Sequence, residues 1–292
     1  MKNARWTAWG LLALGVAAGA LSDGPRPGPR LTMGGYQVLA ADFHVHAFPL
    51  SAGTLAPWDL VLEARRQGLD VIAITGHNGV TMGRIGRWFA QLAGGPTVLA
   101  GEEIHAPGYH LLAVGIGRTI SWRLPAARAI EEVHRQGGVA IAAHPTASSW
   151  PAFDAEAMRT LDASEVVQPL SFAGDPYAGE MRQFNARGRF TATASTDYHG
   201  LGPMGLCRTY VFVHRNSEQA VLEALRAGRT VVYDRGRVFG DPVLIELAAR
   251  DGRLPLASEA DGGLAVVSRV AGILGLLGVA FIGFPRRSAG HG

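Results

Sequence analysis

Imidazole and carboxylate side chains recur at the ends of short apolar runs in this chain, and this placement limits the folds open to it. His44 and His46 lie in the motif Asp-Phe-His-Val-His, and Asp197 and His199 lie in Thr-Asp-Tyr-His. Residues two apart on a strand point to the same side, so each pair can aim two side chains at one point. His144, in Ala-His-Pro, also follows an apolar run. The pattern predicts a metal site at strand ends.

Three further residues extend this pattern. His77 and Glu103 each follow an apolar run, whereas His110 opens one and is the exception. In a barrel of parallel strands, the carboxyl ends of different strands converge on the face where such enzymes carry out their chemistry. The expected metal ligands are therefore His44, His46, His77, Glu103, His110, His144, Asp197 and His199.

The other histidines and the cysteine content narrow the chemistry. A structural role is expected for His105, His134, His214 and His291. Cys207 is the single cysteine, which rules out an internal disulfide and a thiolate zinc site. Any metal must therefore be held by nitrogen and oxygen ligands, which suits zinc, manganese or iron.

Apolar runs alternate with helical patterns through the middle of the chain. Helices are expected at 58–67, 84–93, 125–136, 154–160, 179–187 and 217–226. Strands are expected at 71–75, 97–100, 111–116, 139–143, 163–167, 191–195, 209–213 and 230–233. This alternation predicts an α/β fold with a mainly parallel sheet, and so many units favour closure into a barrel. After residue 242 the pattern changes and predicts a short hairpin or edge addition.

Both ends of the chain are apolar. Lys2 and Arg5 precede the apolar stretch 6–20, which is the layout of a secretory signal, with an uncleaved anchor as the rival interpretation. The stretch 264–284 is long enough to span a bilayer, and the arginines that follow it predict a cytoplasmic tail. We therefore expect membrane association through a C-terminal transmembrane helix, with the catalytic domain outside the cytoplasm.

The expected organisation has four parts. Residues 1–30 form the signal or anchor with its linker, and residues 31–240 form the metal-binding domain. Residues 241–263 form the β extension and linker, and residues 264–292 form the transmembrane segment and tail. The formal net charge is +3, and no basic run is interleaved with aromatic residues, so the chain has no nucleic-acid signature.

Together these motifs resemble a known family. Their order along the chain is similar to that of the PHP domain, the polymerase and histidinol phosphatase family of metallo-hydrolases. The motifs in that order are His-x-His, Gly-His77-Asn, Gly-Glu-Glu103-Ile, His110-Leu-Leu, Ala-His144-Pro and Thr-Asp197-Tyr-His. The resemblance covers about residues 40 to 233. It implies a distorted seven-stranded (β/α)7 TIM-like barrel, with up to three ions of zinc, manganese or iron at its mouth. It also implies hydrolysis of a phosphoester.

The resemblance assigns a ligand set to each ion. His44 and His46 would hold one metal together with Glu103 and Asp197. Glu103 is chosen over Glu102 because it occupies the family's Glu position, before an isoleucine, and it would bridge to a second ion.

The second and third ions follow from the remaining motifs. His110 and His144 would complete the second metal, and His77 and His199 would serve a third. The family usually has Asp or His in the loop after His-x-His, where this chain has Ala52. The missing side chain predicts a weaker third site, so two or three ions are expected.

The expected chemistry follows from these ligands. Two or three divalent ions would lower the pKa of a bridging water, supply hydroxide as the nucleophile and neutralise charge on the phosphoryl oxygens of a small-molecule substrate. Glu103, Asp197 and His199 are the residues expected to take part directly. His199 is the candidate acid for the leaving group unless it is a ligand.

The roles of two further residues remain open. Asp42 either orients an imidazole from behind or is a strand-edge residue. Arg208 either contacts a substrate phosphate or is solvated or ion-paired.

Two other functions remain open. The same metals could attack the carbonyl carbon of an amide or ester. The chain could also be a binding or structural module with a decayed metal site, which Ala52 and Gly76 favour because the family has other residues there.

Overall fold

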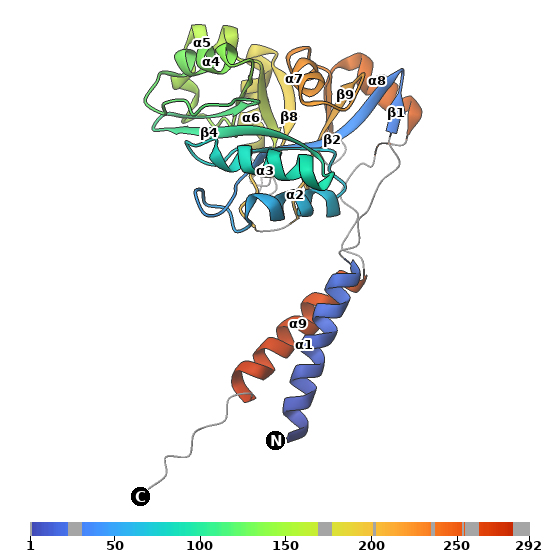
Figure 1. The fold of residues 1–292 in the computed structure, drawn as a ribbon. Coiled ribbons are helices and arrows are strands. Elements are labelled where there is room, and N and C mark those ends of the chain that lie inside the picture. The colour runs from blue at the N-terminus through green and yellow to red at the C-terminus, as the bar shows by residue number, and fades with distance from the viewer. Residues whose placement is uncertain are drawn as a thin grey trace, which may run out of the picture. The chain divides into compact units, whose positions relative to one another are not determined.

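The computed structural model divides into two compact units. One comprises residues 1–25 and 258–292, and the other comprises residues 26–257. The structure describes residues 2–22, 31–168, 177–200, 203–234, 237–252, 254 and 263–282. Each unit is described by itself below (Figure 1).

Strands and helices alternate through the larger unit, as the sequence predicted. The strands are β1 (Leu31–Met33), β2 (Tyr36–Val45), β3 (Val71–Ile74), β4 (Thr97–Ala106), β5 (Tyr109–Val114), β6 (Val139–Ala142), β7 (Ala163–Val167), β8 (Thr191–Ala194), β9 (Thr209–Val213), β10 (Thr230–Asp234) and β11 (Arg237–Gly240). The helices are α2 (Pro57–Arg66), α3 (Thr81–Ala93), α4 (Ala126–Arg135), the 3-10 helix η1 (Trp150–Ala152), α5 (Ala155–Thr160), α6 (Tyr177–Gly188), α7 (Glu218–Arg226) and α8 (Pro242–Asp251).

The strands form one nearly closed sheet. Its order is β11-β10-β9-β2-β3-β4-β5-β6-β7-β8, with β1 beside β2. The hydroxyl of Thr209 donates to the carbonyl of Ala194 at 2.9 Å, and that of Thr230 donates to the carbonyl of Ala192 at 2.8 Å. These bonds tie β8 back to β9 and β10, so the sheet has the shape of a barrel.

The sheet differs from the expected parallel barrel of seven strands. The described residues contribute eleven strands, and only β2-β3-β4 and β6-β7-β8 run parallel. The strand β5 is antiparallel to both β4 and β6, and β9 is antiparallel to β2. A tight connection between β4 and β5 allows this arrangement, because antiparallel neighbours need no crossover helix.

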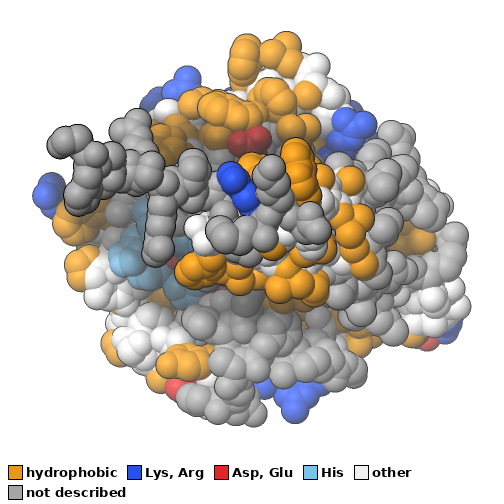
Figure 2. All heavy atoms as spheres, turned by 90° about the horizontal axis from the view of Figure 1, so that it is seen from below, with side chains coloured by type: hydrophobic (Ala, Val, Ile, Leu, Met, Phe, Trp, Pro, Cys, Tyr) orange, Lys and Arg blue, Asp and Glu red, His pale blue; other side chains and the backbone are white. Residues whose placement is uncertain are grey.

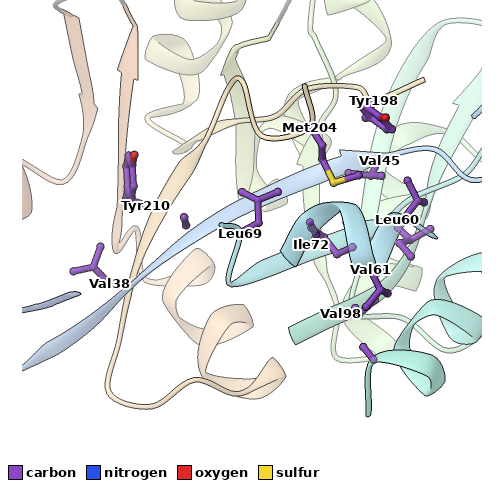
Figure 3. Packing of buried hydrophobic residues seen from close by; sticks show 14 of the residues in the cluster. Val38, Val45, Leu60, Val61, Leu69, Ile72, Val98, Tyr198, Met204 and Tyr210 are labelled. Carbon is purple, nitrogen blue, oxygen red and sulfur yellow. The ribbon is translucent and has the colours of Figure 1, made fainter. Parts of the chain in front are cut away.

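Helix α2 shows how the covering helices are held against the sheet. It begins with a proline in its first turn, where a missing backbone N–H costs no hydrogen bond. It ends with Arg65 and Arg66 in its last turn, where positive charge interacts favourably with the helix dipole. Leu60 and Val61 are buried against Ile72 and Val98 of the sheet (Figure 3). Each such side chain contributes about 1.5–3 kcal/mol when fully buried.

The segment after residue 241 is a helix, and the expected hairpin is wrong. The side chain of Asp241 accepts hydrogen bonds from the backbone N–H groups of Val243 and Leu244, and Pro242 occupies the first turn. Gly252 ends the helix in a left-handed conformation, with φ of 68°. Aspartate, proline and glycine at these positions are typical of a helix start and stop, and they outweigh the short apolar runs between them.

The smaller unit is a pair of helices, α1 (Lys2–Ser22) and α9 (Gly263–Ile282), that contact each other along their length. The hydroxyl of Ser268 donates to the carbonyl of Gly15 at 2.8 Å. A Cβ atom at Gly15 would overlap the backbone of Gly272, so glycine is needed for this approach.

The expected transmembrane helix at 264–284 is not borne out. Among the described residues, no helix is both long enough and apolar enough to cross a membrane. Arg286 and Arg287, on which the expected orientation depended, lie outside the described residues.

Candidate metal centre

The ends of β2 and β8 place two pairs of side chains next to each other. His44 and His46 lie at the end of β2, and Asp197 and His199 follow β8. The backbone N–H of His46 donates to the carbonyl of Tyr198 at 3.0 Å, and that of Tyr198 donates to the carbonyl of His44 at 3.1 Å. This backbone pairing brings the two motifs together although they are about 150 residues apart.

The strands β3 and β4 bring in the next two side chains. His77 follows β3 and pairs with Glu103 of β4 in an isolated parallel bridge. The N–H of Glu103 donates to the carbonyl of Thr75 at 3.0 Å, and its carbonyl accepts from the N–H of Asn78 at 2.9 Å. These hydrogen bonds fix the backbone of Glu103 beside the end of β3.

His110 reaches the same face because β5 is reversed. The strand β5 runs antiparallel to β4 and β6, so its start lies at the same edge as the carboxyl ends of its neighbours. The carbonyl of His110 accepts from the N–H of Ala143 at 3.1 Å, directly before His144. The exception in the sequence pattern is thus explained by strand direction.

Two of these residues adopt a backbone conformation that is unusual for their type. The φ angle is 30° at His144 and 50° at Asp197. Such left-handed residues cost of order 1–3 kcal/mol and cluster at functional sites. The fold thus holds both side chains in a conformation that local preference would not select.

The innermost group contains His44, His46, Glu103 and Asp197, whose potential ligand atoms all lie within 4.8 Å of one another. Nε2 of His44 is 3.3 Å from Oε2 of Glu103 and 3.2 Å from Oδ1 of Asp197. Nε2 of His46 is 2.9 Å from the same Asp197 oxygen and 3.4 Å from Oε2 of Glu103. Both imidazoles are fully buried.

A second group shares Glu103. Its Oε1 lies 2.9 Å from Nδ1 of His110 and 3.4 Å from Nε2 of His144. The two oxygens of Glu103 thus face different groups, which is the geometry of a bridging carboxylate. His110 and His144 are partly exposed, so the site opens outward from its buried floor.

Two outer groups lie nearer to solvent. One contains His46, His77 and His199, and the other contains His77, Glu103 and His105. Figure 2 shows histidine side chains gathered in a hollowed part of the surface. Every expected ligand therefore lies in at least one group with metal-binding geometry.

The polar atoms at the centre of these groups lie within ion-pair distance of one another, but they make no hydrogen bond of acceptable geometry. Within the described residues, these buried, unpartnered atoms are Nε2 of His44, Nε2 of His46, Oε1 of Glu103, Nδ1 of His110 and Oδ1 of Asp197. A buried polar atom without a partner costs about 1–3 kcal/mol. Bound cations would satisfy all five, so this donor set of nitrogens and carboxylate oxygens fits divalent metal ions.

Charges within the site set the protonation states of its members. Burial alone would raise the pKa of Glu103, but the neighbouring imidazoles, above all His44, hold it well below its usual value. Asp197 is affected in the same way, with a lowered pKa. Burial lowers the pKa of His46 to about 4. At neutral pH these three groups are therefore in the states that metals bind, ionised carboxylates and a neutral imidazole.

His44 has a raised pKa in the metal-free protein. Burial lowers its pKa, but the carboxylates of Asp197, Glu165 and Glu103 outweigh burial and raise it well above its usual value. A proton thus compensates for carboxylate charge at this position. Metal binding would displace that proton.

Two supporting residues were missed by the sequence analysis. Oε1 of Glu165, on β7, is 3.1 Å from Nδ1 of His44, and Oε2 accepts from the N–H of His144 at 2.7 Å. The hydroxyl of Ser51 is 2.9 Å from Nδ1 of His46. The available signal for Glu165 was a single charged residue within the buried run of β7.

Asp42 does not orient an imidazole. Its buried carboxylate accepts from the N–H groups of His44 at 3.2 Å, Thr196 at 3.0 Å and Gly205 at 3.1 Å. Burial raises its pKa to about 6. Asp42 therefore fixes the backbone that precedes Asp197 rather than a ligand ring.

Arg208 also has a structural role. Its Nε donates to the carbonyl of Gly205 at 2.6 Å, and its guanidinium donates to the carbonyl of Gln67 at 2.8 Å. These bonds hold the side chain against backbone carbonyls rather than in an ion pair.

The histidines expected to be structural fall into two groups. Nε2 of His134 is 2.7 Å from a carboxylate oxygen of Asp162, and His214 stacks on Tyr36, so both lie in structural contacts. His105 instead lies beside His77 and Glu103, in a group that could hold a metal ion, so its expected structural role stays a prediction. His291 lies outside the described residues.

Sequence similarity to known proteins is limited. No protein-family model matches the chain. An uncharacterized protein of Methanocaldococcus jannaschii is 29% identical over 123 residues, covering 37% of this chain and 68% of that protein.

Solved structures give a wider match. A two-domain protein of Bacteroides vulgatus, described as containing a predicted PHP-like metal-dependent phosphoesterase, is 21% identical. The match covers 77% of this chain and 73% of that chain, with a TM-score of 0.61. PsfC from Pseudomonas syringae is 15% identical, covering 74% of this chain and 96% of that chain, with a TM-score of 0.47.

The fold and site together define an α/β barrel with a cluster of histidines and carboxylates at the strand ends. More particularly, the first of these structures shows that this chain shares the fold of a PHP-like protein, as the resemblance in the sequence implied.

Proposed function

We propose that this chain is a PHP-type metal-dependent phosphoesterase that hydrolyses a small-molecule phosphoester. The observation that carries the proposal is the set of five buried ligand atoms without a hydrogen bond, which belong to two neighbouring groups that share Glu103. A structural role alone would not leave so many buried donors and acceptors unsatisfied. The similar Bacteroides protein is described as containing a predicted phosphoesterase, which supports the same reaction class.

The proposed ligands follow the observed groups. His44, His46, Glu103 and Asp197 would hold the innermost ion. Glu103 would bridge it to a second ion completed by His110 and His144, and a third ion would bind at the outer edge, near His77 and His199. Zinc, manganese and iron all suit nitrogen and oxygen donors in this arrangement.

Bound divalent ions would supply an activated water for attack and neutralise charge on the phosphoryl group. The chain's own residues provide the remaining parts. Glu103 and Asp197 keep their charges at neutral pH because their pKa values are lowered. His199 lies partly exposed at the edge, where its Nδ1 donates to the carbonyl of Asp197 at 2.7 Å. When the ring also carries a proton on Nε2, that N–H can be transferred to a leaving group, and Nδ1–H keeps its bond to the carbonyl.

The test uses the purified protein after removal of metal by a chelator. It is reloaded separately with zinc, manganese or iron(II) and assayed on phosphomonoesters, phosphodiesters, carboxylic esters and amides. We expect phosphoester hydrolysis to return with metal. Hydrolysis of only amides or carboxylic esters would establish the alternative metallo-hydrolase. Metal binding without turnover of any of these substrates would establish a binding module.

We also propose that the catalytic unit lies outside the cytoplasm. This proposal rests only on the amino-terminal segment, where Lys2 and Arg5 precede the apolar stretch 6–20. A reporter enzyme that is active only outside the cytoplasm, fused after Asp261, should be active. Activity of a cytoplasm-specific reporter at the same position would overturn the proposal.

A further inference from the structure

We propose that the helix pair α1–α9 binds the surface of an anionic lipid bilayer through the large apolar side chains on its outside. Neither helix contributes a candidate metal ligand, so this binding is independent of the proposed hydrolysis. The pair is distinguished by which side chains lie between its helices and which lie outside them.

Small residues fill the space between the two helices. A Cβ atom at Gly275 would overlap the backbone of Leu12, and one at Gly278 would lie 2.7 Å from the Cβ atom of Ala8. Ala8 is buried, as is Ala271 on the facing side of α9. Because the end of α9 meets the start of α1, the helices are antiparallel. Their contact leaves no room for larger side chains at these glycines.

The large apolar side chains lie on the outside of the pair. Trp6 of α1 is 76% exposed and Phe281 of α9 is 85% exposed. The other exposed large apolar residues of the two helices are Trp9, Leu14, Val16, Val267, Val270, Ile273, Leu274, Leu276 and Leu277. At about 100° per residue, those of α9 spread over about half of its circumference. One partner helix would cover a narrower stripe, so an apolar phase that surrounds this surface fits it better.

This arrangement is the reverse of that in a water-soluble helix pair. There, large apolar side chains pack between the helices and polar side chains face water. Helices that associate in lipid instead pack through small residues and leave their large apolar side chains outside. Contact with the acyl chains of one leaflet is enough to cover such side chains, so neither helix has to cross the bilayer.

The charged residues of the pair suit an anionic lipid surface. Neither Asp nor Glu occurs in the two helices, whereas Lys2 and Arg5 lie near the start of α1. Trp6 and Trp9 follow these cations, and tryptophan is enriched at the boundary between headgroups and acyl chains. A second copy of the pair offers no carboxylate to the cations, so charge complementarity favours anionic lipid over a second copy.

Flotation with vesicles tests the binding without an activity assay. The full chain is mixed in detergent with phosphatidylcholine and phosphatidylglycerol, the detergent is removed, and the vesicles are floated in a density gradient. The test variant carries Leu276→Glu and Phe281→Glu, both on the outside of the pair. The matched control carries Trp88→Glu and Leu92→Glu, two exposed apolar residues of α3. Circular dichroism confirms the helix content of each protein.

We expect the wild type and the control to float with the vesicles, and the test variant to bind them at least about tenfold less. Loss of flotation in the control but not in the test variant would place the lipid contact on α3 and overturn the inference. A wild type that does not float would also overturn it. Sedimentation equilibrium of that protein as a dimer would then assign the outer surface to a second copy.

Tryptophan fluorescence gives a second measurement on helices that keep their apolar surface. Brominated phosphatidylcholine should quench part of the wild-type emission, because Trp6 and Trp9 are exposed on α1. The double variant Trp6→Phe, Trp9→Phe should lose most of the quenchable emission while it still floats. Quenching equal to that of the wild type in this variant would overturn the inference.

Discussion

At the scale of single residues, Glu165 connects the two inner metal groups. It contacts the ring of His44 through one oxygen and the backbone of His144 through the other, and it is fully buried. A carboxylate behind a ligand imidazole fixes the ring orientation and directs the opposite nitrogen toward the metal. Here that nitrogen is Nε2 of His44, one of the unpartnered atoms.

Replacement of Glu165 should therefore weaken metal binding. We expect Glu165→Gln and Glu165→Ala to lower metal affinity by about 10–100-fold, as for other residues behind metal ligands. Competition with a chromogenic chelator measures the affinity. Glu156→Gln, an exposed glutamate on α5, is the control and should bind metal like the wild type. Unchanged affinity in both Glu165 variants would contradict its positioning role.

Glu102, the neighbour of Glu103, makes stability depend on pH. It is fully buried and its carboxylate accepts from the N–H of Ile120 at 2.5 Å. Burial raises its pKa from 4.5 to about 7. Between these values the folded state holds a proton that the unfolded state has lost, so this group makes stability fall as pH rises through that range.

The variant Glu102→Gln removes this titration. The difference in free energy of unfolding between this variant and the wild type should be independent of pH below pH 4.5. Above that it should increase in favour of the variant, by up to about 3 kcal/mol above pH 7. Urea unfolding at both ends of the range measures the difference. A difference that is constant with pH, or that moves in the opposite direction, would contradict the account.

The sequence predicted the candidate ligand residues better than the residues that hold those ligands in place. His44 and His46 were identifiable because a two-residue spacing on a strand is a local property. Glu165 and Ser51 act through contacts formed only when distant segments meet, so no local pattern marks them. His105 shares the two-residue spacing with Glu103, and that signal was present but set aside.

At the scale of elements, the loop after β2 must pass very close to the ligand strand. A Cβ atom at Gly53 would overlap the carbonyl of His46 and the backbone nitrogen of Ala47. Because the overlap is with backbone, no side-chain rotation can relieve it. The glycine therefore allows the loop carrying Ser51 to lie against both His46 and His77.

We expect Gly53→Ala to displace His46, to destabilise the fold by about 1–3 kcal/mol, and to weaken metal binding. The control is Gly79→Ala, because a Cβ atom there would meet only the carbonyl of His77, at 3.7 Å. Thermal unfolding and metal titration compare the two variants. Equal stability and equal metal affinity would show that the close approach at Gly53 is not required.

Element types were largely predictable, but strand directions were not. The expected helices and strands from residue 57 to residue 233 are confirmed, because their periodicity and caps are local signals. The reversed direction of β5 depends on a short connection to β4, and an apolar run looks the same in either direction. The helix α8 was missed because the change of pattern was given more weight than its aspartate cap.

At the scale of the whole molecule, the strands of the larger unit position the candidate metal centre at one end of the sheet. Strands from both halves of the sheet place their functional ends together, and hydroxyl bonds from Thr209 and Thr230 tie β8 to β9 and β10. Closure of this kind depends on the entire chain. The sequence could indicate it only through the number of alternating units and the resemblance of its motifs.

The smaller unit was predicted only in part. Both apolar ends form helices, as their composition favours, but the close contact between α1 and α9 through Gly15 and Gly272 was not foreseen. The membrane-spanning interpretation of 264–284 is not supported, because no described helix is both long enough and apolar enough to cross a membrane.

The most direct test of the central claim is the metal content of the purified protein and of the double variant His44→Ala, His46→Ala. Both imidazoles point unpartnered nitrogens at the innermost group, and both are fully buried. After exhaustive dialysis, the wild type should retain at least one tightly held transition metal ion, and the folded double variant should lose it. Metal content that is unchanged in the double variant would contradict the assignment of this site.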